Sequence, residues 1–218
     1  MLTASAISAS PTSPPSSAAS AKAEFFVCLS RAFRPMATAK ARASFARDLP
    51  GDLAALATEA GYALEPLLER FATAAREAEG SLLQDYSGLF LVPPVKAPLN
   101  AGLYLDGGLL GRATQAMLER YAQAGLAPDE GFCDLPDHVV MQLEYIATMF
   151  ARAAEGDDAG EARATEFLET LVLPWIPAFA GALQAATAQV PAARAYGALA
   201  AILEAAARHE ALRRSQPD

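Results

Sequence analysis

A carboxylate and an imidazole stand side by side near the middle of the chain, in the segment DLPDHVVMQLEYI, residues 134–146. Asp137 directly precedes His138, and Glu144 follows about two turns later on the face that Asp137 would share with it in a helix. Such a set could work in acid–base catalysis, supply metal ligands, cap a helix or bind a partner. The rest of the chain decides among these four possibilities.

The catalytic and metal hypotheses find little support elsewhere. The sequence has only two histidines and two cysteines, Cys28 and Cys133, which form no CxxC pair. A four-ligand zinc site would need nearly all of them. No GxSxG nucleophile motif occurs, and DGGLLGR lacks the ending of a P-loop. His209 falls in the last turn of a terminal helix, where we expect it to be solvated. We therefore predict no catalytic residue, no metal and no cofactor.

The same segment has the pattern of a helix start. Asp134 suits the N-cap, Pro136 the first turn, and Asp137 the third position, where an acidic residue favours the positive end of the helix dipole. The pattern predicts a helix over residues 135–154. The dipole should hold His138 towards its neutral form, which can donate and accept a hydrogen bond at once. Capping thus explains Asp137 better than it explains His138.

Helical periodicity dominates the remaining sequence, and no alternating strand pattern or fixed-period repeat stands out. We predict one compact all-α domain of seven to nine helices over residues 21–214. The expected helices lie at 22–34, 52–61, 66–80, 81–90, 109–125, 135–154, 161–172, 175–188 and 191–214. Pro174 and Pro177 should separate or kink the two that they lie between. Residues 92–108 form a long proline- and glycine-rich loop, which in a compact domain is more often functional than idle.

The N-terminus and the charge limit the compartment and the partners. Residues 1–20 are rich in Ser, Ala, Pro and Thr and lack the basic start and apolar run of a secretory signal, so we predict a disordered tail. The most apolar run, LETLVLPWIPAFAGAL, is too short to span a bilayer. A soluble cytoplasmic protein is expected. The net charge of −8 argues against nucleic acid and would suit a cationic partner, although ordinary solubility also explains it.

Three segments, taken in order, resemble one protein family. DYSGLFLVPP, APLNAGLYLDGGLLG and DLPDHVVMQLEYI are similar to ordered segments of the TorD/DmsD-type cytoplasmic chaperones, the redox-enzyme maturation proteins, to which NarJ is more distantly related. LPWIPAFAGAL is similar to a fourth and weaker segment, in which a Trp and a downstream Phe pack a late helix. The resemblance covers roughly residues 22–190. Asp134 stands where the family usually has Glu, and Asn100 or Ala101 lies near its usual Ser.

The resemblance implies a helical chaperone without catalytic activity. It would bind the twin-arginine leader of a molybdenum-containing oxidoreductase and hold the apoenzyme until its cofactor is inserted. Matched position by position, Asp137 and His138 correspond to the Asp–His pair implicated in leader recognition. The family's aromatic–Leu–Phe patch and its Tyr-Leu-Asp segment correspond to Tyr86, Leu89, Phe90, Tyr104 and Asp106.

Physical chemistry agrees with this expectation. A twin-arginine leader presents two guanidinium groups and then an apolar run, so its receptor needs carboxylates and an apolar groove. Asp137, Glu144 and Asp106 could supply the carboxylates. The apolar contacts could come from Tyr86, Leu89, Phe90 and Tyr104.

Two alternatives stay open. The protein could be a NarJ-like assembly factor that contacts mainly the mature enzyme, or, as a minor alternative, an acid–base enzyme that uses the carboxylates of Asp137 and Glu144. The sequence identifies neither the client nor the oligomeric state, for which a monomer and a domain-swapped dimer are both expected options.

Overall fold

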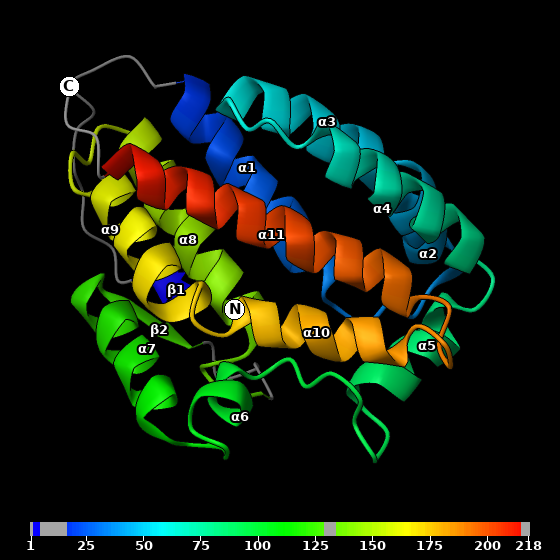
Figure 1. The fold of residues 1–218 in the computed structure, drawn as a ribbon. Helices are drawn as coiled ribbons and strands as arrows, with labels where there is room; N and C mark the ends of the chain where they lie inside the picture. Colours follow the sequence, from blue (N-terminus) through cyan, green and yellow to red (C-terminus); the bar gives the residue numbers. More distant parts are fainter. Residues whose placement is uncertain (1, 5–16, 129–133, 215–218) are drawn as a thin grey trace.

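The computed structural model describes residues 2–4, 17–128 and 134–214. These residues form eleven α-helices, one π-helical turn and a small two-stranded sheet, arranged as in Figure 1. The all-α prediction is confirmed.

The helices follow one another with short connections. They are α1 (Ser17–Ala32), α2 (Ala39–Arg47), α3 (Leu49–Ala60), α4 (Glu65–Ala78), α5 (Leu82–Phe90), α6 (Ala101–Leu105), α7 (Arg112–Gln123), α8 (Val139–Ala154), α9 (Gly160–Phe167), the π-helical turn η1 (Leu168–Val172), α10 (Ile176–Ala186) and α11 (Ala193–Arg214). Strand β1 (Leu2–Ala4) pairs antiparallel with β2 (Leu126–Pro128), with Thr3 opposite Ala127.

The described residues hold more helices than the seven to nine predicted, because two short ones left no visible apolar stripe in the sequence. Helix α2 buries only Phe45 and Ala46, and its start is fixed by Thr38, whose side chain accepts a hydrogen bond from the Ala41 N–H at 3.1 Å. Helix α6 is little more than one turn inside the segment 92–108, which we expected to be non-helical. Helices this short bury too few residues to show a 3.6-residue period.

The described ends of the segment 1–20 take part in the fold. Residues 2–4 form β1, and α1 begins at Ser17, five residues before the helix start that the sequence indicated. The small sheet has no counterpart in the prediction, because three-residue strands show no alternation. Residues 5–16, on which most of the tail prediction rests, lie outside the described residues, as does Cys133.

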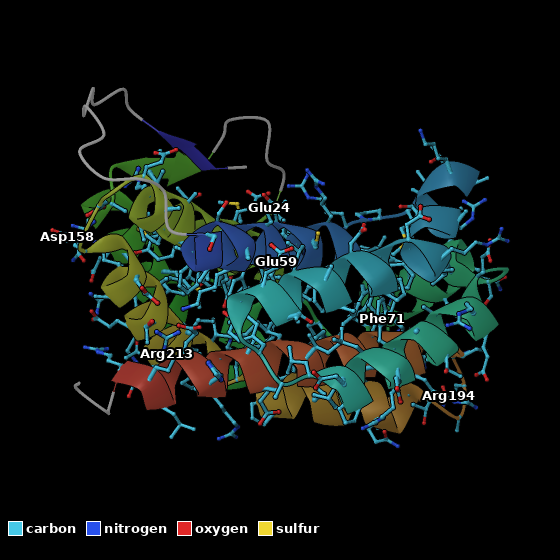
Figure 2. All side chains as sticks on the ribbon, turned by 90° about the horizontal axis from the view of Figure 1, so that it is seen from above. Glu24, Glu59, Phe71, Asp158, Arg194 and Arg213 are labelled. Atoms are coloured by element: carbon cyan, nitrogen blue, oxygen red, sulfur yellow. The ribbon has the colours of Figure 1, made fainter. Side chains whose placement is uncertain are left out.

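Two helices form the centre of the core. Helix α1 packs on α8 and α3, and Phe26 of α1 stacks on Phe150 of α8 with ring centroids 5.6 Å apart. Helix α11 crosses the molecule and packs on α4 and α10, as Figure 1 shows. Its many alanines allow close approach on several sides, so it is buried around most of its circumference. Figure 2 shows the side chains that fill the space around α1, α4 and α11, among them the fully buried Phe71.

One ion cluster lies inside this core. Lys22 of α1 is 1% exposed, and its Nζ lies 3.0 Å from the Glu210 carboxylate of α11 and 2.6 Å from Glu161 of α9. The same Nζ is 5.2 Å from the centroid of the Phe150 ring. Glu210 is as buried as Lys22, so this pair joins three helices without contact with solvent.

The chain bends where the sequence predicted a break. Helix α9 runs into η1 and ends before Pro174, and α10 starts again with Pro177 at its second position, where a missing N–H is tolerated. Among the described helices, none is by itself long and apolar enough to cross a bilayer. Gly160–Val172 and Ile176–Ala186 meet that test only as a pair, by length and composition, and the pair is bent by 55°.

Candidate functional site: the start of α8 and the groove beside it

The start of α8 is tied to the segment that precedes α6. The Ala101 N–H donates to the Asp137 carbonyl at 3.1 Å, and the Val139 N–H donates to the Leu99 carbonyl at 2.8 Å, which pairs the two segments antiparallel around Asn100 and His138. Residues 135–138 are therefore held by tertiary hydrogen bonds rather than in a helix. This corrects the predicted start at 135: α8 begins at Val139.

Asp137 is enclosed by these segments. Its side chain is 0% exposed, its Oδ2 accepts a hydrogen bond from the Gly102 N–H at 2.8 Å, and its Oδ1 accepts one from the Asn100 amide at 3.3 Å. Position 102 requires glycine, because a Cβ there would lie 2.8 Å from Asp137 Oδ2. Asp137 thus satisfies a backbone N–H in the first turn of α6. A guanidinium from solvent would reach it only after α6 had moved.

His138, and not Asp134, is the N-cap of α8. The His138 Nδ1 accepts a hydrogen bond from the Val140 N–H at 3.2 Å, so the proton of the neutral ring is on Nε2. That Nε2 lies 3.6 Å from Oδ2 of Asp134, whose side chain is 45% exposed. Burial lowers the pKa of His138, while the neighbouring Asp134 and Asp137 oppose the shift. The neutral imidazole expected from the helix dipole is therefore present chiefly because it is buried.

Replacing His138 with Asn should flatten the acid side of the pH–stability profile. The folded state holds the pKa of His138 below its ordinary value of 6.5, so the unfolded chain binds the extra proton first. The cap therefore contributes fully above pH ~6.5, and its contribution is lost as pH falls below that value. Asn caps helices well and does not titrate. Urea unfolding at pH 7 and pH 5 should show wild type losing about 1 kcal/mol more than His138→Asn. His209→Asn, the matched control, should retain the wild-type slope, and an equal slope in all three proteins would contradict this assignment.

Three of the predicted contact residues lie in the core. Tyr86 and Leu89 are buried, and the Tyr86 hydroxyl donates to the Phe33 carbonyl at 2.9 Å. The ring of Phe90, also buried, packs edge-on against Tyr196 with centroids 4.9 Å apart. The aromatic–Leu–Phe pattern thus fixes α5 against α11 and the end of α1, and these side chains line no open surface here.

Tyr104 and Asp106 hold the turn around α6. The half-buried Tyr104 ring stacks on Trp175 with centroids 5.6 Å apart, and its hydroxyl donates to the Pro98 carbonyl at 2.9 Å. Trp175 in turn packs against Phe179, with centroids 5.5 Å apart. The exposed Asp106 accepts a hydrogen bond from the Ala113 N–H at 2.8 Å, so its carboxylate caps α7.

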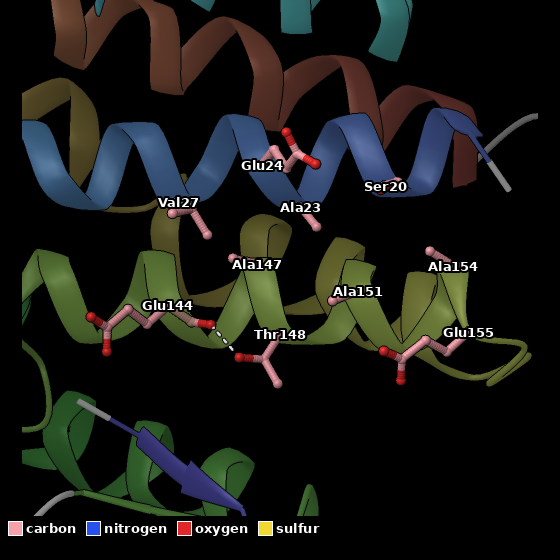
Figure 3. A pocket seen from close by; sticks show the side chains of 10 residues that line it. All are labelled: Ser20, Ala23, Glu24, Val27, Glu144, Ala147, Thr148, Ala151, Ala154 and Glu155. Carbon is pink, nitrogen blue, oxygen red and sulfur yellow. Dashed lines mark hydrogen bonds between the residues drawn. The ribbon is translucent and has the colours of Figure 1, made fainter. Parts of the chain in front are cut away.

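Glu144 lies elsewhere, on the wall of an open groove between α1 and α8. Figure 3 shows this groove, which holds about 560 Å³. Its floor consists of small apolar side chains, and three carboxylates line it. The lining residues are Ser20, Ala23, Glu24, Val27, Glu144, Ala147, Thr148, Ala151, Ala154 and Glu155. We call this the acidic groove.

One end of the acidic groove meets the start of α8. Arg34, just beyond the end of α1, forms an ion pair with Glu144, and the Arg34 side chain is 37% exposed. Asp134, Arg34 and Glu144 are all near enough to His138 to influence its pKa, which burial sets. We call these four residues the polar cluster. The structure therefore joins His138 and Glu144 in one cluster, while Asp137 lies beneath it.

Sequence reasoning missed several members of this site. It took Asp134 for a cap, and it did not consider Arg34, Glu24 or Glu155. A signal for Glu155 existed, since the predicted face with Glu144 and Thr148 continues at helical spacing to Glu155. Arg34 gave no signal, because its partner lies 110 residues away.

A further residue that the sequence did not indicate is Gln142, which is 0% exposed. Its side-chain amide donates to the Asp137 carbonyl at 2.7 Å, and its Oε1 accepts a hydrogen bond from the Trp175 indole at 3.1 Å. Gln142 thereby connects the start of α8 to α10. Among the described residues, no group of three His, Cys, Asp or Glu side chains is arranged to hold a metal ion.

The fold and this site define a helical accessory protein with an acidic groove. Residues 53–181, more than half of the chain, match the family model of the nitrate reductase delta subunit. The chain therefore belongs to the nitrate reductase delta subunit family, the TorD/NarJ-type group of redox-enzyme maturation chaperones that the sequence resemblance indicated.

Two individual proteins are similar to it. The chaperone protein TorD of Photobacterium profundum is 29% identical over 117 residues, which are 50% of this chain and 54% of that protein. The chain thus spans about half the length of this curated relative. A crystal structure of a candidate redox enzyme maturation protein from Archaeoglobus fulgidus superposes with a TM-score of 0.46 and 18% identity, covering 89% of this chain and 94% of that one.

Proposed function

We propose that this protein is a cytoplasmic chaperone that binds the twin-arginine leader of a molybdenum-containing oxidoreductase and holds the apoenzyme until its cofactor is inserted. It acts by binding and not by catalysis. The observation that carries the proposal is the acidic groove, with the polar cluster at one end, in a member of a family of redox-enzyme maturation chaperones.

The chemistry of a leader matches this surface in two parts. Its guanidinium groups form charge-assisted, often bidentate hydrogen bonds with carboxylates, here those of Asp134 and Glu144. Its apolar segment lies on the small side chains of α1 and α8, such as Ala147 and Ala151. From Glu144 to Glu155 the groove follows α8 for about 16 Å at 1.5 Å per residue, which accommodates about three turns of a helical segment.

The other predicted contact residues support the site from behind. Asp137 fixes α6 beneath the polar cluster, and His138 orients the start of α8. Tyr86, Leu89 and Phe90 hold α5 against the end of α1, from which Arg34 extends. In this proposal these residues position the surface, and Asp134 takes the role that the sequence assigned to Asp137.

Asp134→Asn and Glu144→Gln should each weaken leader binding about tenfold, since a hydrogen bond to a charged group contributes roughly 1.5 kcal/mol or more. The probe is a synthetic peptide with two adjacent arginines followed by ~12 apolar residues, the latter matched to the groove length. Isothermal titration calorimetry measures Kd. A second peptide, with both arginines replaced by glutamine, should bind the wild type weakly.

The matched control is Glu77→Gln, which removes an exposed carboxylate on α4 far along the chain from the groove. It should bind the peptide as the wild type does. If all three variants bind alike and remain folded, or if the glutamine peptide binds as tightly as the arginine peptide, the assignment of this surface fails.

A NarJ-like role, with the mature enzyme as the main contact, is favoured by a different observation. Within the described part of the chain, eight of the nine exposed large hydrophobic residues lie between positions 83 and 110. They are Leu83, Leu91, Val92, Val95, Leu103, Leu105, Leu109 and Leu110. An apolar surface of this kind suits a partner that is not fully folded. Binding of a leaderless client as tightly as the intact client would favour this alternative.

A further inference from the structure

A second pocket lies on the other side of α8, between α7 and α9. It holds about 210 Å³ and is more enclosed than the acidic groove. Three helices contribute hydrogen-bond donors to its wall: Arg120 and Gln123 from α7, Tyr145 from α8 and Arg163 from α9. In a chain of net charge −8, two guanidinium groups in one small pocket are unexpected.

Tyr145 forms the base of this pocket. The residue is only 2% exposed, and its ring packs on Phe167 with centroids 4.5 Å apart. Its hydroxyl has no hydrogen-bond partner among the described residues, although Arg120, Arg152 and Arg163 are all near enough to influence its pKa, which burial raises. A buried hydroxyl that lacks an acceptor in a pocket lined by arginines suits an anionic ligand.

The two guanidinium groups of the pocket are held in place by carboxylates that leave other N–H groups for a ligand. Arg120 lies 2.6 Å from Glu166 of α9, and Arg163 lies 2.9 Å from Asp157. A guanidinium has five N–H donors, and a single carboxylate contact uses one or two of them. These ion pairs fix both side chains across the gap between α7 and α9.

We propose that the pocket lined by Arg120, Gln123, Tyr145 and Arg163 binds the phosphate group of a small ligand. A planar carboxylate is satisfied by one guanidinium from one direction. A tetrahedral oxyanion accepts hydrogen bonds from several directions, which is how donors on three different helices surround this pocket. Its volume admits a phosphate group and little more, so any larger part of the ligand lies outside it. The site shares no residue with the acidic groove or the polar cluster.

Potassium phosphate, titrated into the full chain at pH 7 with ionic strength held constant by potassium chloride, tests the site. We expect a Kd of about 1 mM or lower, a value typical of a weak but specific site. Arg163→Gln should weaken binding at least tenfold. Tyr145→Phe, which removes one hydroxyl and preserves the packing of the ring, should weaken it several-fold.

Glu166→Gln gives the discriminating result, because it removes a negative charge from the pocket wall and should strengthen phosphate binding several-fold. A purely structural Arg120–Glu166 pair would give no such gain. Arg194→Gln, in an exposed ion pair with Glu77 at 3.4 Å, is the matched control and should bind phosphate as the wild type does.

Glycerol phosphate and a nucleoside 5′-monophosphate separate the two sources of the same group. Monoesters that bind more tightly than inorganic phosphate identify a phosphorylated small molecule, and equal affinities identify free phosphate; both support the site. The absence of binding up to 20-fold above the expected Kd, or phosphate binding that Arg163→Gln and Tyr145→Phe leave unchanged, overturns it. Neither result depends on leader binding, so this proposal can fail while the proposed function stands.

Discussion

Asp137→Ala should lower the free energy of unfolding by about 3 kcal/mol. The substitution removes the acceptor of the Gly102 N–H, at 2.8 Å, and of the Asn100 amide, in a site with no access to solvent. Each buried donor left without a partner costs roughly 1–3 kcal/mol. Urea unfolding followed by circular dichroism measures the loss.

Asp134→Ala is the matched control from the same segment. The Asp134 carboxylate is half exposed, and water can replace it as acceptor for the Leu135 N–H and the Asn100 amide. Its loss should cost less than about 1 kcal/mol, as is usual for surface substitutions, while it weakens leader binding. Equal destabilisation by the two substitutions would show that burial does not separate the two aspartates.

Lys22→Ala should cost about 3–5 kcal/mol, because it leaves the Glu210 carboxylate buried without a cation. Arg208→Ala breaks an exposed pair with Glu204 on the same helix as Glu210 and should cost less than about 0.5 kcal/mol. Thermal and urea unfolding of both variants measure the difference.

The double substitution Lys22→Met and Glu210→Leu tests the cause of that loss. It removes both charges and keeps most of the side-chain volume, so it should recover much of the stability lost in Lys22→Ala. If the double variant is as unstable as the single one, packing and not the unpaired charge explains the loss. If Lys22→Ala costs no more than Arg208→Ala, the cluster does not stabilise the core.

The long helices could be predicted because each buries a stripe that recurs over several turns. Phe25, Phe26 and Leu29 gave α1, and Pro174 and Pro177 gave the break before α10. The start of α8 could not be predicted in the same way. Asp134 and Pro136 form a good local start signal, but hydrogen bonds to Leu99 and Ala101 prevail over it. Local pattern contains no information about a segment that pairs from about 40 residues away.

The candidate site was predictable in its location and not in its chemistry. Asp134 and Asp137 have the same side chain and are three residues apart, and only the position of α6 decides which of them is buried. The aromatic–Leu–Phe pattern likewise fits a core face and a contact surface equally well, and for Tyr86, Leu89 and Phe90 the structure shows the core face. Lys22 and Arg34 were missed because their partners lie 188 and 110 residues away.

The ion pair between Arg34 and Glu144 makes the proposed recognition an exchange. An incoming guanidinium that reaches Glu144 displaces one that is already there, so the first arginine replaces like with like and its net contribution is close to zero. A second arginine, received by Asp134, displaces no guanidinium among the described contacts of that carboxylate, and it supplies most of the gain. A receptor that carries its own arginine in this way discriminates by the number of arginines in a segment, and it would leave single-arginine segments of other proteins largely unbound.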